Sequence, residues 1–585
     1  MIQHIKNPWV LFAAICIAVY CMVIAGSIGK PFSSDEIYNA GWAHGIAETG
    51  TPAYYSGDDV QLLKRLKEPV SHPTLHVNLL ALMILVFGMK YWALRLLGVF
   101  LFAGTILFLK FRVHRRLNLP DSQLVLTGFF LVFNPLFVQE SIVLAIEAQA
   151  FWFFLLMYFY AFYRESVGHA RFRFYPYLWT TLGIVSLLWL KETNFPVYIA
   201  CSVIYLLVIG QFKKLPAYIL ASAIAVGLFW GSWLLYCKVT GADVWSWWEF
   251  TVQNKMMKGD MGIHHVIDRN GWGEAFQRIG SSMRVTITWS SVPYLVLFFV
   301  AIGIRVRDII RKNRSIAFAE LCMFYALMLF AVTKILRPTD AFIKYEVPAH
   351  LLAAIFMADV YIDTVRKHLT TFLFILCTAV AAGLCVSLDI PDRLLQIEKT
   401  FPIHVFRSVW IFTIAFLVVR VLLKKCTLTS ISLGLMVPLV VLNTGLYVHQ
   451  STNNYVTGQS WGNYGEDLVA PTKWLKKHLK NGEGIAAFKD LQFNMRFVEG
   501  KDRSPTFEAR TFTRSGKRRK WRSSESEKNR ILASGKIKYF VLSRYTDSKS
   551  GRKYLKKHGY RRVKKVAEHI IYEKESGRDA ERERR

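Results

Sequence analysis

The sequence predicts an all-α polytopic membrane protein of about thirteen transmembrane helices, followed by a small extracytoplasmic C-terminal α/β domain. Hydrophobic residues make up 53% and aromatic residues 15% of the 585 positions, and the mean hydropathy is +0.28. The apolar residues form blocks of about 17 to 24, the length that a helix needs to cross the hydrocarbon layer of a bilayer. After residue 447 these blocks end, and the chain becomes polar and rich in lysine and arginine.

Each apolar block is expected to be a helix, because only a helix satisfies all its backbone hydrogen bonds within lipid. The first block is too long for a secretory signal and is followed by further spans, so it is predicted to remain as a transmembrane helix. The predicted spans are Trp9–Ile28, Trp92–Phe111, Ser122–Val138, Ala148–Tyr163, Tyr175–Leu190, Phe195–Gly210, Leu215–Cys237, Val285–Ile304, Ala317–Thr333, Tyr345–Ile362, Thr370–Leu388, His404–Leu423 and Leu428–Tyr447.

Lysine and arginine in the short loops predict the orientation of the chain. With the amino end in the cytoplasm, every predicted inner loop is basic, as in 111–116, 164–173 and 305–314. This is the positive-inside pattern of a protein of the inner (plasma) membrane. An odd number of spans then places the carboxyl end on the extracytoplasmic side. Much of the net charge of +32 lies in these loops, so it indicates contact with membrane lipids and no nucleic-acid partner.

Three regions follow from these patterns. Residues 1–447 form the transmembrane domain, 448–575 the basic extracytoplasmic domain and 576–585 a disordered charged tail. In the second region strand-like runs alternate with helical patterns, which is typical of a small α/β domain. Its basic surface either binds anionic lipid head groups or envelope polysaccharide, or keeps the domain soluble. The strand-like runs are 484–488, 537–542 and 567–572.

The first outer loop, residues 29–91, is long and contains one short apolar segment, Leu75–Phe87. At about 13 residues this segment is too short to cross the bilayer. It is therefore predicted to be a helix that lies in the membrane interface or re-enters the membrane from outside.

Charged and polar side chains gather at the outer ends of the predicted spans. A charged group beside hydrocarbon is unfavourable, so these residues are candidates for function. Structural roles are the alternative: helix capping at Asp35, a turn at His72 before Pro73, and snorkelling of the basic side chains. The candidates are Asp35, Glu36, Glu68, His72, Glu147, Lys191, Arg337, Lys344 and Tyr345.

The candidates belong to short motifs that follow one another along the first part of the chain, together with Arg95, Pro135, Ser141, Glu192 and Pro348. The order of these motifs resembles the GT-C glycosyltransferase superfamily, in the branch that includes the lipid A aminoarabinose transferase and the protein O-mannosyltransferases. The resemblance covers roughly residues 1–363. Two positions depart from the family pattern, because Thr74 replaces a second proline and Glu147 replaces the commoner aspartate. The motifs are Asp35-Glu36, His72-Pro73-Thr74-Leu75, Arg95, Pro135 with Ser141 and Glu147, Lys191-Glu192, and Lys344-Tyr345 with Pro348.

The resemblance implies an enzyme that transfers a sugar, with inversion, from a polyprenyl-phosphate donor to a lipid, glycan or protein acceptor of the cell envelope. In such an enzyme Asp35 acts as the base and Glu36 is its neighbour at the reaction centre. The phosphate is neutralised by Lys191, Lys344 and Arg337, beside Tyr345. His72 orients the acceptor, contacts the phosphate of the donor, or helps Glu68 or Glu147 to hold a divalent metal ion, the one cofactor that the resemblance leaves open.

Two other functions are compatible with the composition. A transporter or flippase of lipid-linked sugars would place charges near the middle of the bilayer and would be built from related halves. A non-catalytic envelope scaffold would use only the basic C-terminal region. The sequence has neither a P-loop nor a Rossmann glycine motif, which favours a lipid-linked donor over a nucleotide sugar.

Overall fold

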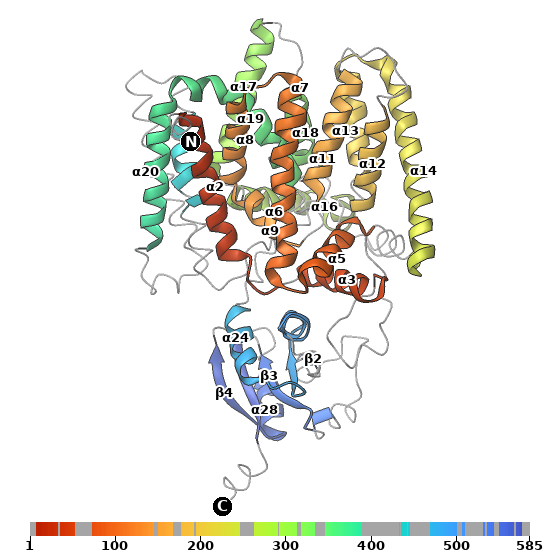
Figure 1. The fold of residues 1–585 in the computed structure, drawn as a ribbon, viewed down its shortest axis with the longest axis vertical. Helices are drawn as coiled ribbons and strands as arrows, with labels where there is room; N and C mark the ends of the chain where they lie inside the picture. The colour runs from red at the N-terminus through yellow and green to blue at the C-terminus, as the bar shows by residue number, and fades with distance from the viewer. Residues whose placement is uncertain are drawn as a thin grey trace, which may run out of the picture.

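The computed structural model describes most of the chain, and Figure 1 shows upright helices at one end of the molecule and a β-sheet at the other. The described residues are 7–32, 35–52, 73–144, 150–167, 177–191, 195–245, 263–289, 292–312, 318–333, 346–388, 432, 434–441, 443–444, 468–499, 506–508, 531–532, 535–542, 549–566 and 569–575.

Apart from the third and the eighth, the predicted spans up to Thr370–Leu388 correspond to helices with similar bounds. Span His404–Leu423 and most of span Leu428–Tyr447 lie outside the described residues, so the number of thirteen stays a prediction. The upright helices are α2 (Pro8–Ser27), α6 (Tyr91–Phe108) with η1 (Leu109–His114) and α7 (Arg115–Leu117), α8 (Asp121–Val132), α11 (Phe151–Phe162) with η2 (Tyr163–Val167), α12 (Tyr177–Lys191), α13 (Phe195–Val208), η4 (Phe212–Lys214) with α14 (Leu215–Thr240), α17 (Val292–Lys312), α18 (Phe318–Ala331), α19 (Val347–Lys367) and α20 (Leu369–Leu388).

By length and composition alone, four helices of the described part could cross a membrane. A fifth is added if α8 and the short helix α9 (Pro135–Ile142) count as one span. Other apolar helices, including α12 and α18, are only 10–17 residues long.

The third predicted span, Ser122–Val138, is wrong as a continuous helix. α8 ends at Val132, and α9 turns away from it by 83°. The break has a local cause: Asn134 accepts a hydrogen bond from the Phe137 N–H (3.0 Å) as the N-cap of α9, and Pro135 occupies the first turn. Proline lacks a backbone donor and is favourable at this first helical position, where no donor is needed.

The start of the eighth predicted span also needs correction. Val285 belongs to α16 (Ile263–Trp289), and the helix that corresponds to the span, α17, begins at Val292. α16 was not predicted. It is bent at Gly271, whose φ of 79° lies in the left-handed region that glycine adopts readily.

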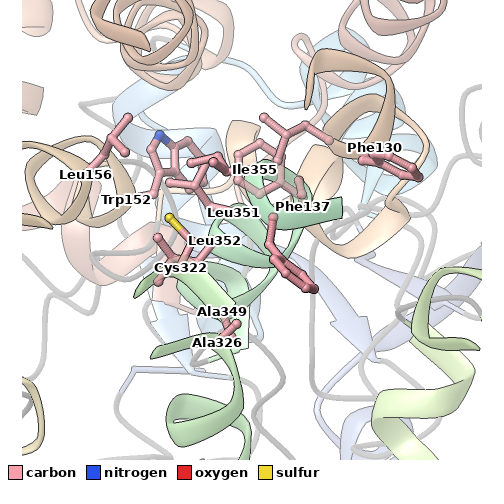
Figure 2. Close-up of a cluster of buried hydrophobic side chains, with 14 of the residues drawn as sticks. Phe130, Phe137, Trp152, Leu156, Cys322, Ala326, Ala349, Leu351, Leu352 and Ile355 are labelled. Atoms are coloured by element: carbon pink, nitrogen blue, oxygen red, sulfur yellow. The ribbon is translucent and has the colours of Figure 1, made fainter. Parts of the chain in front are cut away.

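α19 lies at the centre of the hydrophobic core. Leu351, Leu352 and Ile355 of this helix face Trp152 of α11 and Cys322 of α18 (Figure 2). These side chains are almost completely buried, so α19 packs on several sides at once. Such burial all round is typical of a central helix in a bundle.

Two helices lie across the end of the bundle that faces the sheet, α3 (Asp35–Thr49) and α5 (Leu75–Phe87) (Figure 1). α5 has the bounds predicted for the interfacial helix. It ends at Gly88, whose positive φ of 79° stops the helix. The two helices pack on each other through one hydrophobic cluster, which includes Ile37, Trp42 and Leu80.

The C-terminal part contains a five-stranded sheet in the order β2-β1-β3-β5-β4. β1 pairs in parallel with β2 and β3, whereas β5 is antiparallel to β3 and β4. β1 and β3 fall on predicted strand-like runs, and β5 overlaps the third. The elements are α24 (Val469–His478), β1 (Gly484–Ala487), α25 (Lys489–Phe493), η8 (Asn494–Val498), β2 (Thr506–Glu508), β3 (Ile537–Leu542), α28 (Lys549–Lys557), β4 (Tyr560–Val566) and β5 (His569–Lys574).

Candidate active site

The predicted reaction centre lies at the start of α3. Asp35 is the first residue of this helix, and Glu36 follows it in the first turn. Carboxylates are favourable at this position, because the helix dipole places partial positive charge at the amino end. The Glu36 side chain is buried, with 2% of its surface exposed.

Glu36 forms a buried, two-pronged ion pair with Arg95 of α6. The Arg95 Nε donates to Glu36 Oε1 (3.1 Å), and Nη2 donates to Oε2 (2.9 Å). A guanidinium matches a carboxylate in this geometry, which fixes direction as well as distance. Because both groups are buried, each compensates the other's loss of hydration. Glu36 is thereby held in one orientation.

The same guanidinium also binds the end of the first helix. Ser27 is the last residue of α2, and the last carbonyls of a helix have no partner within it. Arg95 Nη1 donates to the carbonyls of Ser27 (3.3 Å), Ile28 (3.2 Å) and Lys30, and Nη2 donates to that of Pro31 (3.3 Å). Arg95 therefore joins the carboxyl end of α2 to the amino end of α3 and fixes the backbone of residues 28–31 between them.

The segment after α9 also contacts Glu36. The Leu144 N–H donates to Glu36 Oε1 (3.4 Å), and Asn39 of α3 donates to the Leu144 carbonyl. Tyr20 of α2 and Ser141 of α9 lie 3.2 Å apart through their hydroxyl groups. The chain that leads towards Glu147 is thus attached to both α2 and α3.

Besides Glu36, Lys191 is a candidate whose side chain lies in the described part of the structure. It is the last residue of α12 and is only 2% exposed. Six candidates lie outside the described residues: Glu68, His72, Glu147, Arg337, Lys344 and Tyr345. Nothing of their arrangement is established, and their roles stay predictions.

The structure adds residues to which the sequence gave no site role. Arg95 was recognised only as part of the family pattern, although a buried arginine in an apolar span is a signal in itself. Lys30, 9% exposed, lies in the connection that Arg95 binds. Asn494 of the C-terminal part binds the backbone of Phe32, which is 462 positions away. No sequence pattern pointed to that contact.

His76, in the first turn of α5, is completely buried. Within the described part of the chain, neither of its ring nitrogens has a hydrogen-bond partner. Burial lowers the pKa of His76 to about 3, so the ring is neutral at physiological pH. Next to it, Asn78 accepts a hydrogen bond from the hydroxyl of Tyr236 (3.3 Å). The amino end of α5 therefore combines a neutral imidazole with a polar pair.

A metal site is not apparent in the described residues, among which no group of three or more His, Cys, Asp or Glu could hold an ion. The candidate ligands His72, Glu68 and Glu147 lie outside them. A divalent metal ion therefore stays a prediction.

Comparisons with known proteins concern the fold. No protein-family model and no curated protein matches the sequence. Among solved structures, ArnT from Cupriavidus metallidurans bound to undecaprenyl phosphate superposes with a TM-score of 0.57 at 14% identity, covering 97% of this chain and 98% of that one. Its apo form gives a TM-score of 0.55 at 13% identity, covering 96% and 97%. The predicted GT-C fold is thus confirmed as a fold: over nearly its whole length, the chain has the architecture of ArnT.

Proposed function

We propose that the protein is an integral membrane glycosyltransferase. It transfers a sugar from a polyprenyl-phosphate donor to a lipid, glycan or protein of the cell envelope, on the extracytoplasmic side. The observation that carries this proposal is the Glu36–Arg95 pair, which fixes the first turn of α3 and thus the position of Asp35. The fold supports it, since the ArnT structure with this fold contains undecaprenyl phosphate.

Asp35 acts as the base in the proposed reaction, and Glu36 positions it. The acceptor hydroxyl gives its proton to the Asp35 carboxylate as its oxygen attacks the anomeric carbon of the donor. The bond from that carbon to the phosphate oxygen breaks, and the polyprenyl phosphate leaves with the electron pair. The transition state resembles an oxocarbenium ion, which a fixed carboxylate stabilises.

In this proposal Lys191 neutralises the charge of the leaving phosphate, together with Lys344 and Arg337 and beside Tyr345. A cation at the buried end of α12 acts in a site of low dielectric constant, where its attraction to phosphate is stronger than in water. The donor's polyprenyl chain stays in lipid meanwhile. His72, Glu68 and Glu147 bind the acceptor or a divalent ion.

The experiment is a transfer assay with purified protein in lipid nanodiscs, using polyprenyl-phosphate donors that carry a radiolabelled sugar and extracted envelope fractions as acceptors. We expect labelled product from wild type and a loss of at least about 100-fold in Asp35→Asn, because base catalysis is typically worth this much. Asp121→Asn is the matched control, since Asp121 pairs with Lys110 (2.9 Å) at an exposed site at the start of α8.

Two outcomes would contradict the proposal. Equal labelling by wild type and Asp35→Asn would remove Asp35 from the mechanism. No transfer by wild type from any donor, combined with movement of labelled donor between the two leaflets of a vesicle, would replace the transferase with a flippase.

A further inference from the structure

We propose that Asn494 of the C-terminal α/β domain is a positioning residue of the active site, so that this domain is a part of the catalytic unit. The inference rests on the proposed transferase function and names a residue to which that function alone assigns no role. Its starting point is one contact between the two parts of the chain.

The Asn494 side chain binds both backbone groups of Phe32. Its Oδ1 accepts from the Phe32 N–H (3.0 Å), and its Nδ2 donates to the Phe32 carbonyl (2.7 Å). Both residues are completely buried. The amide therefore replaces the two hydrogen bonds that a neighbouring strand would make, and it holds the backbone at Phe32 in one register.

Phe32 is well placed to transmit this constraint to the reaction centre. It lies in the short connection between α2 and α3, just before Asp35 in the sequence. Its ring lies 5.1 Å from the guanidinium of Arg95 and 5.1 Å from the ring of Tyr91, almost edge-on. A shift of Phe32 would therefore move the arginine that orients Glu36, the neighbour of Asp35 in the first turn of α3.

The C-terminal domain is anchored at this place by apolar contacts too. Phe493 is buried in the same cluster as Phe32 and Ile37. The ring of Phe497 meets that of His44 on α3 at 5.1 Å. Asn494 opens the π-helical turn η8, directly after α25. Such turns interrupt an α-helix to place particular side chains, and they are frequent at functional sites.

If Asn494 only attached the C-terminal domain to the helices, its variants would behave differently from those of a positioning residue. Adhesion alone would change the stability of the domain and leave turnover of the folded enzyme unchanged. Positioning changes the turnover, because a reacting group displaced by about 1 Å can lose on the order of 100-fold in rate. Donor binding depends on the phosphate-binding groups and the lipid, so KM for the donor should change little.

The test compares Asn494→Ala and Asn494→Asp with Gln492→Ala in the full-length protein. Gln492 is the matched control, because it is a buried amide on α25 whose Nε2 donates to the Ala487 carbonyl (2.6 Å) within the domain. We expect kcat to fall at least about tenfold in both Asn494 variants, with KM for the donor within about twofold of wild type. Asn494→Asp should fail as well, since a carboxylate cannot donate to the Phe32 carbonyl.

Hydrogen exchange of the peptide that contains Phe32 supplies a second readout that needs no activity. We expect its protection to fall in Asn494→Ala and to stay in Gln492→Ala. Wild-type kcat in both Asn494 variants would overturn the inference while leaving the transferase intact. An equal loss of kcat in Gln492→Ala would reduce Asn494 to a stabilising residue. If wild type transfers no sugar, the proposed function fails and the catalytic role with it, and the exchange result alone reports whether Asn494 holds Phe32.

Discussion

Arg95 and Glu36 are the residues on which the arrangement of the site depends most. Arg95→Leu leaves a buried carboxylate without its cation and removes the hydrogen bonds that Arg95 donates to the backbone carbonyls after α2. We expect a loss of about 3–5 kcal/mol in the free energy of unfolding, as for other broken buried pairs. The measurement is denaturant unfolding of the purified protein in mixed micelles.

The double variant Glu36→Leu with Arg95→Leu is the control for this prediction. It removes both charges and should regain part of the stability lost in the single variant. Recovery stays incomplete, because the hydrogen bonds that Arg95 donates to the carbonyls of Ser27 and Ile28 are still lost. A single Arg95→Leu variant as stable as wild type would contradict the view that this pair fixes the end of α2 and the start of α3.

His76 gives a prediction about pH. The folded ring stays neutral because burial lowers its pKa to about 3, whereas the ring in the unfolded chain takes up a proton below about pH 6.5. The unfolded state therefore binds more protons, and stability falls as the pH drops below about 6.5. We expect His76 to contribute a loss of about 2 kcal/mol between about pH 7.5 and about pH 5.

The contribution of His76 is measured as the difference in this pH dependence between wild type and His76→Leu. His368→Leu is the comparison, since His368 is exposed at the end of α19. The prediction fails if His76→Leu loses as much stability as wild type over the same pH interval.

At the scale of elements, the break between α8 and α9 is the feature that apolar length alone mispredicted. Hydrophobicity continues through residues 131–138, so the composition does not show the turn. The local chemistry does, because an asparagine followed by proline is a typical helix start. Asn134 adds a contact outside the helix, with its Nδ2 lying 3.0 Å from Nδ1 of His350 on α19.

Asn134→Ala tests how far this cap holds the break. It removes the hydrogen bond to the Phe137 N–H and the contact to His350 together. We expect a loss of about 1–2 kcal/mol in the free energy of unfolding, at the upper end for a cap because the site is buried. Asn134→Ser should regain about half of this, since serine still caps. Equal stability of all three proteins would show that packing alone makes the turn.

Across the whole molecule, the sequence is sufficient to predict most of the membrane-spanning helices. It does not predict which residues far apart in the sequence contact one another. Spans such as Trp9–Ile28 were predicted well, since the thickness of the hydrocarbon layer fixes their length. Asp35 and Glu36 are candidates because charge beside a span is unusual, and their roles stay predictions. The Arg95–Glu36 pairing joins residues 59 positions apart on two helices, and the Asn494 contact joins residues 462 positions apart. Neither pairing has a periodic pattern that a single sequence could reveal.

The C-terminal part has exposed basic residues on an outer strand of its sheet. β4 is an edge strand of the sheet, and Arg562, Lys564 and Lys565 on it are exposed. Positive charge on an edge strand prevents the strand from pairing with other chains. Solubility alone would therefore explain these three basic residues. An acidic acceptor or envelope polymer would be attracted by the same residues, and that attraction would weaken with salt.

The two roles are separated by measuring how the full-length protein in nanodiscs binds a fluorescent acidic polysaccharide at increasing salt. We expect binding that weakens as the salt concentration rises. Changing Arg562, Lys564 and Lys565 together to glutamine should lower the affinity at least about fivefold, because the three lost charges together contribute about 1 kcal/mol to the binding free energy. Lys473→Gln with Lys477→Gln, on the exposed face of α24, is the control within the same domain. Equal losses of affinity in both variants would mean that the polysaccharide is attracted by the positive charge of the whole C-terminal part and not by β4 in particular. No binding by wild type at low salt would leave solubility as the role of these residues, because an edge strand that attracts no polyanion still resists aggregation through its charge.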